Sequence, residues 1–141
     1  IIPDDAIRGA YITQRNSDHY GSLSPFMRAA LLGGYTKEGK EWIDALMEFS
    51  GENEKIVRDF FAENFPKVHF CRHRAGTLLW ADFREMGTEE EVYAWFQKAG
   101  VEPDLGSKYG EEGRGFLRLQ IGMPKRELNY ALERIKKAYV K

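Results

Sequence analysis

The chain has 141 residues, of which 43% are hydrophobic and 30% are charged, a composition typical of one soluble globular domain. Its formal net charge of -1, from 21 basic and 22 acidic residues, argues against binding to nucleic acid or to an anionic membrane. The single cysteine, Cys71, excludes an internal disulfide, and no apolar run approaches the roughly 18 residues of a membrane span, so we expect a cytoplasmic protein.

The chain begins at Ile1-Ile2 instead of at a methionine, and we therefore expect a piece of a longer protein. An acidic turn at residues 3–5 precedes apolar residues at helical spacing, which predicts a helix with a favourable first turn. The polar run at residues 15–18 ends this helix and predicts a loop.

A long helical stretch follows. Ser24 is a good N-cap, and Pro25 stands at the first helical position. Apolar residues then recur at spacings of three and four until Pro66, which cannot continue a helix. Glycines interrupt the pattern, so we expect the stretch to bend near residues 33–40 and again near Ser50-Gly51.

The next segments predict two strands and a short helix. Residues 68–72 and 77–83 are rich in β-formers, and Arg74-Ala75-Gly76 between them predicts an antiparallel pair. Residues 88–91 read TEEE, which is a capping box, and Gly100 stands where a helix begun there would end.

The last third predicts a loop, a strand and a helix. The charged, glycine-rich residues 101–115 predict a loop with a short strand at Val101-Glu102. Residues 115–122, GFLRLQIG, predict a strand, and Pro124 begins a final helix with one apolar side. The order of elements predicts an α+β fold, in which helices cover a small, mostly antiparallel sheet of three or four strands and a long helix leads in from the N-terminal side.

Arg118 stands in the middle of the GFLRLQIG strand. Alternation along a strand places it on the face opposite to Leu117 and Leu119. It is either a solvated arginine on an outer face or an anion receptor, since a guanidinium on a rigid strand presents a planar fork that matches a carboxylate.

The glycine-rich loop and the strand after it resemble a known signature. Residues 98–139 resemble the C-terminal part of fold-type I, pyridoxal-phosphate-dependent aminotransferases, closest to the branch of the MalY and PatB cystathionine β-lyases. Residues 33–46, GGYTKEGKEWIDAL, and residues 75–84, AGTLLWADFR, also resemble segments of this family. Gln120 and Gly122-Met123 depart from the branch, so the choice between transamination and β-elimination stays open.

The resemblance implies a division of labour within a longer enzyme. Residues 1–24 would be the end of the large cofactor-binding domain and its linker, and residues 25–141 the small C-terminal domain. Arg118 would bind the α-carboxylate of an amino-acid substrate, with Tyr20, Gly21 and Ser22 as candidate contacts of substrate or cofactor.

The lysine that binds pyridoxal phosphate would lie before Ile1, in a large N-terminal domain that this chain lacks. The chain alone would then hold no catalytic residue and would be inactive. The intact enzyme would be a homodimer.

Three other interpretations compete with this one. Lys108, which follows Ser107, resembles the context of the cofactor lysine, but its spacing to the strand fits the C-terminal loop, and we reject that role. His69, Cys71 and His73 would share one strand face, as a zinc site requires, but no fourth ligand is evident. A free-standing carboxylate-binding or interaction module without catalysis is the alternative function.

Overall fold

The computed structural model describes residues 1–20 and 23–139. The chain divides into two compact units, Ile1–Ile43 and Asp44–Lys141, each considered by itself below. The domain division after residue 24, which rests on the family resemblance, stays a prediction. Within the described ranges no helix combines the length and the apolar character needed to cross a bilayer.

Two capped helices form most of the first unit. The side chain of Asp4 caps α1 (Asp5–Ser17), and the hydroxyl of Ser24 caps α2 (Pro25–Gly34) by accepting a backbone N–H. Both helices were predicted from the sequence, but α1 continues through residues 15–17, so the prediction of a loop at residues 15–18 is wrong for these three residues. Neither contains a buried residue, so their apolar side chains do not form a core of their own.

The predicted long stretch is two helices instead of one bent helix. α2 ends at Gly34, and α3 (Lys37–Asn64) begins after Thr36, whose hydroxyl accepts the N–H of Gly39 at 3.1 Å. The sequence also predicted a bend at residues 50–51. This prediction is wrong in that the helix is not interrupted there, because α3 continues through both residues. A helical glycine costs only about 1 kcal/mol relative to alanine, and the apolar face that follows it is buried.

The second unit contains a sheet of four strands, β1 (His69–Phe70), β2 (Leu78–Asp82), β3 (Asp104–Leu105) and β4 (Phe116–Gln120). The strands lie in the order β1-β2-β4-β3, and every neighbouring pair is antiparallel. This confirms the predicted small antiparallel sheet in an α+β fold.

The end of α4 explains why β3 does not lie where the sequence predicted it. α4 (Glu89–Ala99) has the predicted capping box at Thr88, and Gly100 ends it in the left-handed region with φ of 67°. The N–H of Val101 still bonds to the carbonyl of Phe96 at 3.0 Å, so Val101 belongs to the helix C-terminus. The strand starts three residues later, and the prediction of a strand at Val101-Glu102 is wrong.

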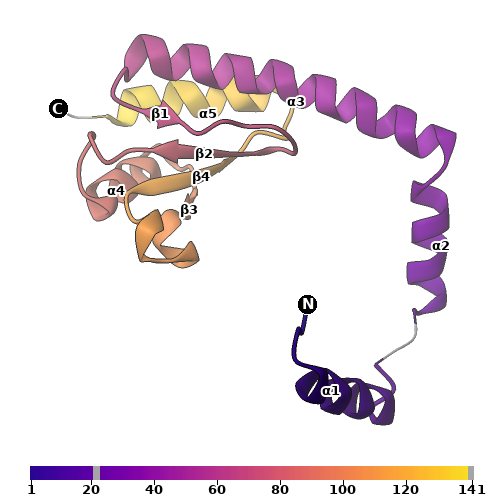
Figure 1. Cartoon of the computed structure of the whole chain (residues 1–141). Helices are drawn as coiled ribbons and strands as arrows, with labels where there is room; N and C mark the ends of the chain where they lie inside the picture. The colour runs from indigo at the N-terminus through magenta and orange to yellow at the C-terminus, as the bar shows by residue number, and fades with distance from the viewer. Residues whose placement is uncertain (21–22, 140–141) are drawn as a thin grey trace. The chain divides into compact units, whose positions relative to one another are not determined.

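The core lies between one face of the sheet and three helices, α3, α4 and α5 (Lys125–Ala138), of which α3 and α5 run side by side above the sheet in Figure 1. Burial of each large apolar side chain contributes roughly 1.5–3 kcal/mol. The fully buried apolar side chains come from the sheet and from the helices and turns around it: Phe61, Leu79, Phe83, Phe96, Leu117 and Ile121. This packing fixes β4, whose other face points away from α3, α4 and α5.

Candidate functional site

Arg118 lies on the face of the sheet that points away from the helices. Leu117 and Ile121 are each 1% exposed on the core side, as the alternation predicted. Arg118 pairs in register with Trp80 on β2 and with Asp104 on β3, and its side chain is 32% exposed. A half-buried arginine held between two strands is better ordered than a solvated one.

Asp104 is the ionic partner of Arg118. Nε of Arg118 donates to Oδ2 of Asp104 at 3.0 Å, and Nη2 donates to the same oxygen. Nζ of Lys108 lies 3.6 Å from Oδ1 of Asp104. The hydrogen bonds from Arg118 hold the pKa of Asp104 below its usual value, so this carboxylate is ionised at neutral pH.

One aromatic ring lies against the guanidinium, and two more rings pack in a row beside it. Cζ of Arg118 lies 5.1 Å from the centre of the Tyr109 ring, within the range of a cation–π contact. Trp80 meets Tyr109 edge to face and stacks on Phe116 with an angle of 17° between the rings. We call Arg118, Asp104, Lys108, Tyr109 and Trp80 the arginine site.

The loop that carries Lys108 and Tyr109 is anchored by Glu89, the first residue of α4. Glu89 is 7% exposed, and its Oε2 accepts the N–H groups of Ser107 at 3.3 Å and of Gly115 at 3.1 Å. Burial alone would raise the pKa of Glu89, but hydrogen bonds from the Ser107 side chain and from the backbone of Gly115 and Ser107, with the charge of Arg114, outweigh it and hold the pKa below its usual value. The ionised carboxylate therefore stabilises the loop.

We expect Glu89→Gln to lower the free energy of unfolding at pH 7 by about 1–2 kcal/mol, because an amide oxygen accepts hydrogen bonds more weakly than a carboxylate. Since the folded-state pKa is depressed, the contribution of Glu89 is present above its unfolded value of about 4.3 and is lost as the pH falls through the folded value. Urea unfolding at pH 7 and at about pH 3 measures both effects. Glu90→Gln, at an exposed neighbour, is the control, and equal losses at the two positions would contradict the role of Glu89.

The loop also depends on two glycines in direct contact. A Cβ at Gly106 would lie 2.0 Å from the carbonyl oxygen of Gly113, and a Cβ at Gly113 would lie 2.2 Å from the carbonyl oxygen of Gly106. Both obstacles are backbone atoms, so rotation of a side chain cannot relieve them. The glycines allow the chain to fold back and place Tyr109 beside Arg118.

Gly106→Ala is accordingly expected to destabilise the protein by about 1–3 kcal/mol, the usual cost of forcing an extra methyl into a packed region. The matched control is Gly51→Ala in α3, where no atom lies within 4 Å of the new Cβ. That change should stabilise the protein by up to about 1 kcal/mol through helix propensity. Urea midpoints followed by circular dichroism compare the two, and an unchanged midpoint for Gly106→Ala would show that the loop relaxes without cost.

The other residues singled out in the sequence lie elsewhere. Tyr20 belongs to the first unit and is 82% exposed, while Gly21 and Ser22 lie outside the described residues, so all three stay predictions. His73, one of the three zinc candidates, is paired with a carboxylate, since its Nδ1 lies 2.6 Å from Oε2 of Glu54.

The structure also shows how the three zinc candidates lie. Nε2 of His69 lies 3.7 Å from Oε1 of Glu85, and Cys71 is exposed. In the part of the chain that the structure describes, no three His, Cys, Asp or Glu side chains are grouped as a metal site.

Sequence reasoning missed Asp104 and Glu89. Both lie among other charged residues, Asp104 in the loop and Glu89 in the first turn of a helix. The sequence alone therefore did not mark either of them as a candidate site residue. The one available signal was register: a strand at 104–105 would have placed Asp104 opposite Arg118, but the strand was predicted at 101–102.

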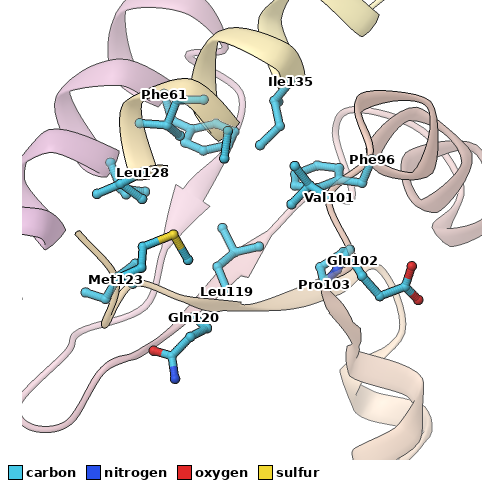
Figure 2. Close-up of a pocket in the computed structure, with 14 residues that line it drawn as sticks. Phe61, Phe96, Val101, Glu102, Pro103, Leu119, Gln120, Met123, Leu128 and Ile135 are labelled. Carbon is cyan, nitrogen blue, oxygen red and sulfur yellow. The ribbon is translucent and has the colours of Figure 1, made fainter. Parts of the chain in front are cut away.

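A second feature, an apolar cavity of about 220 Å³, lies on the helix side of the sheet (Figure 2). Its lining is apolar except for Glu102 and Gln120, and Leu119 of β4 contributes to it. Glu102 accepts a hydrogen bond from the hydroxyl of Tyr93. Among the described residues that line this cavity there is one carboxylate and no cationic side chain that could bind an anion, so the arginine site is the better candidate.

Known proteins resemble the chain over nearly its whole length. It is 33% identical to cystathionine β-lyase PatB of Bacillus subtilis over 98% of the chain and 36% of that protein. It is 31% identical to protein MalY of Escherichia coli over 91% of the chain and 33% of that protein. The chain thus spans about a third of the length of these relatives.

Solved structures agree in fold. The chain superposes on cystalysin of Treponema denticola, which contains pyridoxal 5'-phosphate, with a TM-score of 0.82 and 28% identity, over 98% of the chain and 35% of cystalysin. A pyridoxal-phosphate-bound protein of Clostridium difficile 630 gives a TM-score of 0.82 and 26% identity, over 98% of the chain and 36% of that protein. No protein-family model matches the chain.

Proposed function

Because the chain is homologous to the C-terminal part of pyridoxal-phosphate-dependent C–S lyases and aminotransferases, we propose that it is the C-terminal domain of such an enzyme and supplies the arginine that binds the substrate carboxylate. The observation that carries the proposal is Arg118, half-buried and held by Asp104 and Tyr109 on the face of the sheet opposite to α3, α4 and α5. The test measures 2-oxo acid formation from a panel of amino acids and compares the full-length protein with its Arg118→Ala variant.

The role of Arg118 in the reaction is to bind and to orient. Two parallel N–H···O bonds from a guanidinium fix both the position and the plane of a carboxylate. Holding the α-carboxylate in this way turns the bond to be broken at the α-carbon toward the orientation that the reaction requires. Pyridoxal phosphate, when bound, supplies the sink for the electrons of that bond.

The residues of the arginine site fit a substrate carboxylate better than the cofactor itself. Its lysine, Lys108, is 59% exposed, and its Nζ lies 3.6 Å from Oδ1 of Asp104, so it is paired with a carboxylate of the site itself. A lysine that forms a covalent bond with the cofactor is one activated for that reaction by its surroundings. We therefore assign the covalent anchor of the cofactor to the remainder of the full-length protein.

The 141-residue chain alone is expected to form no stoichiometric covalent adduct when it is mixed with pyridoxal phosphate and reduced with borohydride. Surface lysines should give only scattered, substoichiometric labelling, because an exposed lysine keeps its proton at neutral pH. Mass spectrometry of the intact chain and of its peptides measures the labelling, and the full-length protein serves as the positive control. One adduct per chain at a single lysine would overturn the assignment.

The first unit supports the presence of a further domain. α1 and α2 carry no buried residue, although many of their side chains are large and apolar. The most exposed are Ile7, Phe26, Met27 and Leu32. Large apolar side chains exposed in this number are typical of an interface, and we assign them to contacts with the rest of the full-length protein. Homodimeric assembly and a cytoplasmic location complete the proposal, on the family resemblance and the lone cysteine.

A further inference from the structure

We propose that Asp104 is a positioning residue, which holds the guanidinium of Arg118 by one edge so that the other edge faces the substrate carboxylate. The inference rests on the proposed function, because it presumes that Arg118 binds substrate. It adds a residue that acts through Arg118 and has no contact of its own with the substrate.

The geometry of the pair carries the proposal. A guanidinium has a side edge, formed by Nε and one Nη, and an end edge, formed by the two Nη atoms. Asp104 occupies the side edge of Arg118, since Nε and Nη2 both donate to its Oδ2. Among the residues that the structure describes, Nη1 of Arg118 has no hydrogen-bond partner. The end edge is therefore the one that can receive a carboxylate in a bidentate manner.

The backbone holds Asp104 and Arg118 in a fixed position opposite each other. Asp104 lies in β3 directly opposite Arg118 in β4, so the sheet fixes the distance between the two backbones. Tyr109 covers one face of the guanidinium at 5.1 Å. A free arginine side chain has many accessible rotamers, and these two restraints on the plane of the guanidinium remove most of that freedom before the substrate arrives. Preorganisation of this kind improves affinity without a new contact to the ligand.

Lys108 explains how the site keeps its attraction for an anion. A carboxylate beside Arg118 would by itself cancel the positive charge that a substrate needs. Nζ of Lys108 lies 3.6 Å from the other oxygen of Asp104, so the three side chains together carry a net charge of about +1. One bound α-carboxylate neutralises this charge.

The test compares Asp104→Ala and Asp104→Asn in the full-length enzyme. For Asp104→Ala we expect KM for the amino acid to rise about tenfold, with kcat changed by less than about threefold, because the substrate once bound meets the same groups. Asp104→Asn should recover most of the affinity, since its amide oxygen can still accept from Nε. Asp82→Ala, which removes the partner of Arg84 on the same sheet, is the matched control and should leave KM unchanged.

A crystal structure of the Asp104→Ala enzyme gives a second readout, in which the Arg118 guanidinium should leave its position over Tyr109. An unchanged guanidinium, an unchanged KM, or a KM that falls because Asp104 competes with the substrate would each overturn the proposal. If Arg118→Ala raises KM and Asp104→Ala does not, only this inference fails. If Arg118→Ala leaves kcat/KM unchanged, the proposed function itself fails.

Discussion

Under the proposed function, replacement of Arg118 with alanine in the full-length protein is expected to lower kcat/KM for an amino-acid substrate by about 100-fold to 1,000-fold. This corresponds to roughly 3–4 kcal/mol, within the range for removing one partner of a hydrogen-bonded charge pair. The loss has two parts: the substrate carboxylate loses its bidentate partner, and Asp104 is left without the guanidinium that now balances it. Steady-state kinetics over a range of substrate concentrations measures the effect.

Two further variants make this result specific. Arg118→Lys keeps the charge and loses the planar fork, so its kcat/KM should lie between those of the natural enzyme and the alanine variant. Arg84→Ala removes an arginine that is paired with Asp82 on the same sheet and should change kcat/KM by less than about threefold. Similar losses for Arg84→Ala and Arg118→Ala would mean that the sheet, and not a carboxylate contact, explains the effect.

The sequence predicted the helices and strands wherever the signal was local. The caps at Asp4, Ser24 and Thr88 and the left-handed Gly100 all lie where the residue types place them, because a cap depends only on the neighbouring four residues. The alternation along β4 was predicted for the same reason. The capped helix starts, the pairing of β1 with β2 and the buried face of β4 could therefore be predicted from the residue pattern alone.

Features that depend on distant contacts could not be predicted in this way. The continuity of α3 through Gly51 depends on packing of the helix after it, where Val57 and Phe61 are buried against other elements. The position of β3 depends on where the C-terminal turn of α4 ends, which shifts the strand by three residues. The pairing of Asp104 with Arg118 follows from that register and was therefore missed with it.

The function of Arg118 was a question that residue chemistry alone left open. Strand alternation placed it on the outer face but did not distinguish a solvated arginine from a receptor. The structure adds a partner on the neighbouring strand and an aromatic face, and the relatives add the class of enzyme. Under the proposed function, the rest of the full-length protein brings the substrate to the free edge of the guanidinium, which is why the kinetic tests use the full-length protein.

Asn53→Asp should destabilise the second unit by about 3–5 kcal/mol at pH 7, the range for an uncompensated buried charge. Asn53 is 0% exposed in the middle of α3, and its amide nitrogen donates to the carbonyls of Ile121 at 2.7 Å and Met123 at 2.8 Å. These carbonyls lie between β4 and α5, so one side chain connects the long helix to the end of the strand that carries Arg118. A carboxylate would face both carbonyl oxygens without a proton to donate.

The pH dependence of Asn53→Asp distinguishes charge repulsion between the new carboxylate and the carbonyl oxygens from a purely steric effect of the substitution. Because burial against carbonyl oxygens disfavours the charged form, the pKa of the new carboxyl would be raised, and the deficit in unfolding free energy should be largest well above an aspartate's usual value of about 3.9. It should shrink as the pH falls, since a protonated carboxyl can donate to one carbonyl. Urea unfolding at pH 7 and at about pH 4 measures this change. Asn64→Asp, where a partly buried amide donates to the single carbonyl of Phe60, is the control and should cost less than about 1 kcal/mol. Equal costs at residues 53 and 64 would mean that the strand end is held by apolar packing alone.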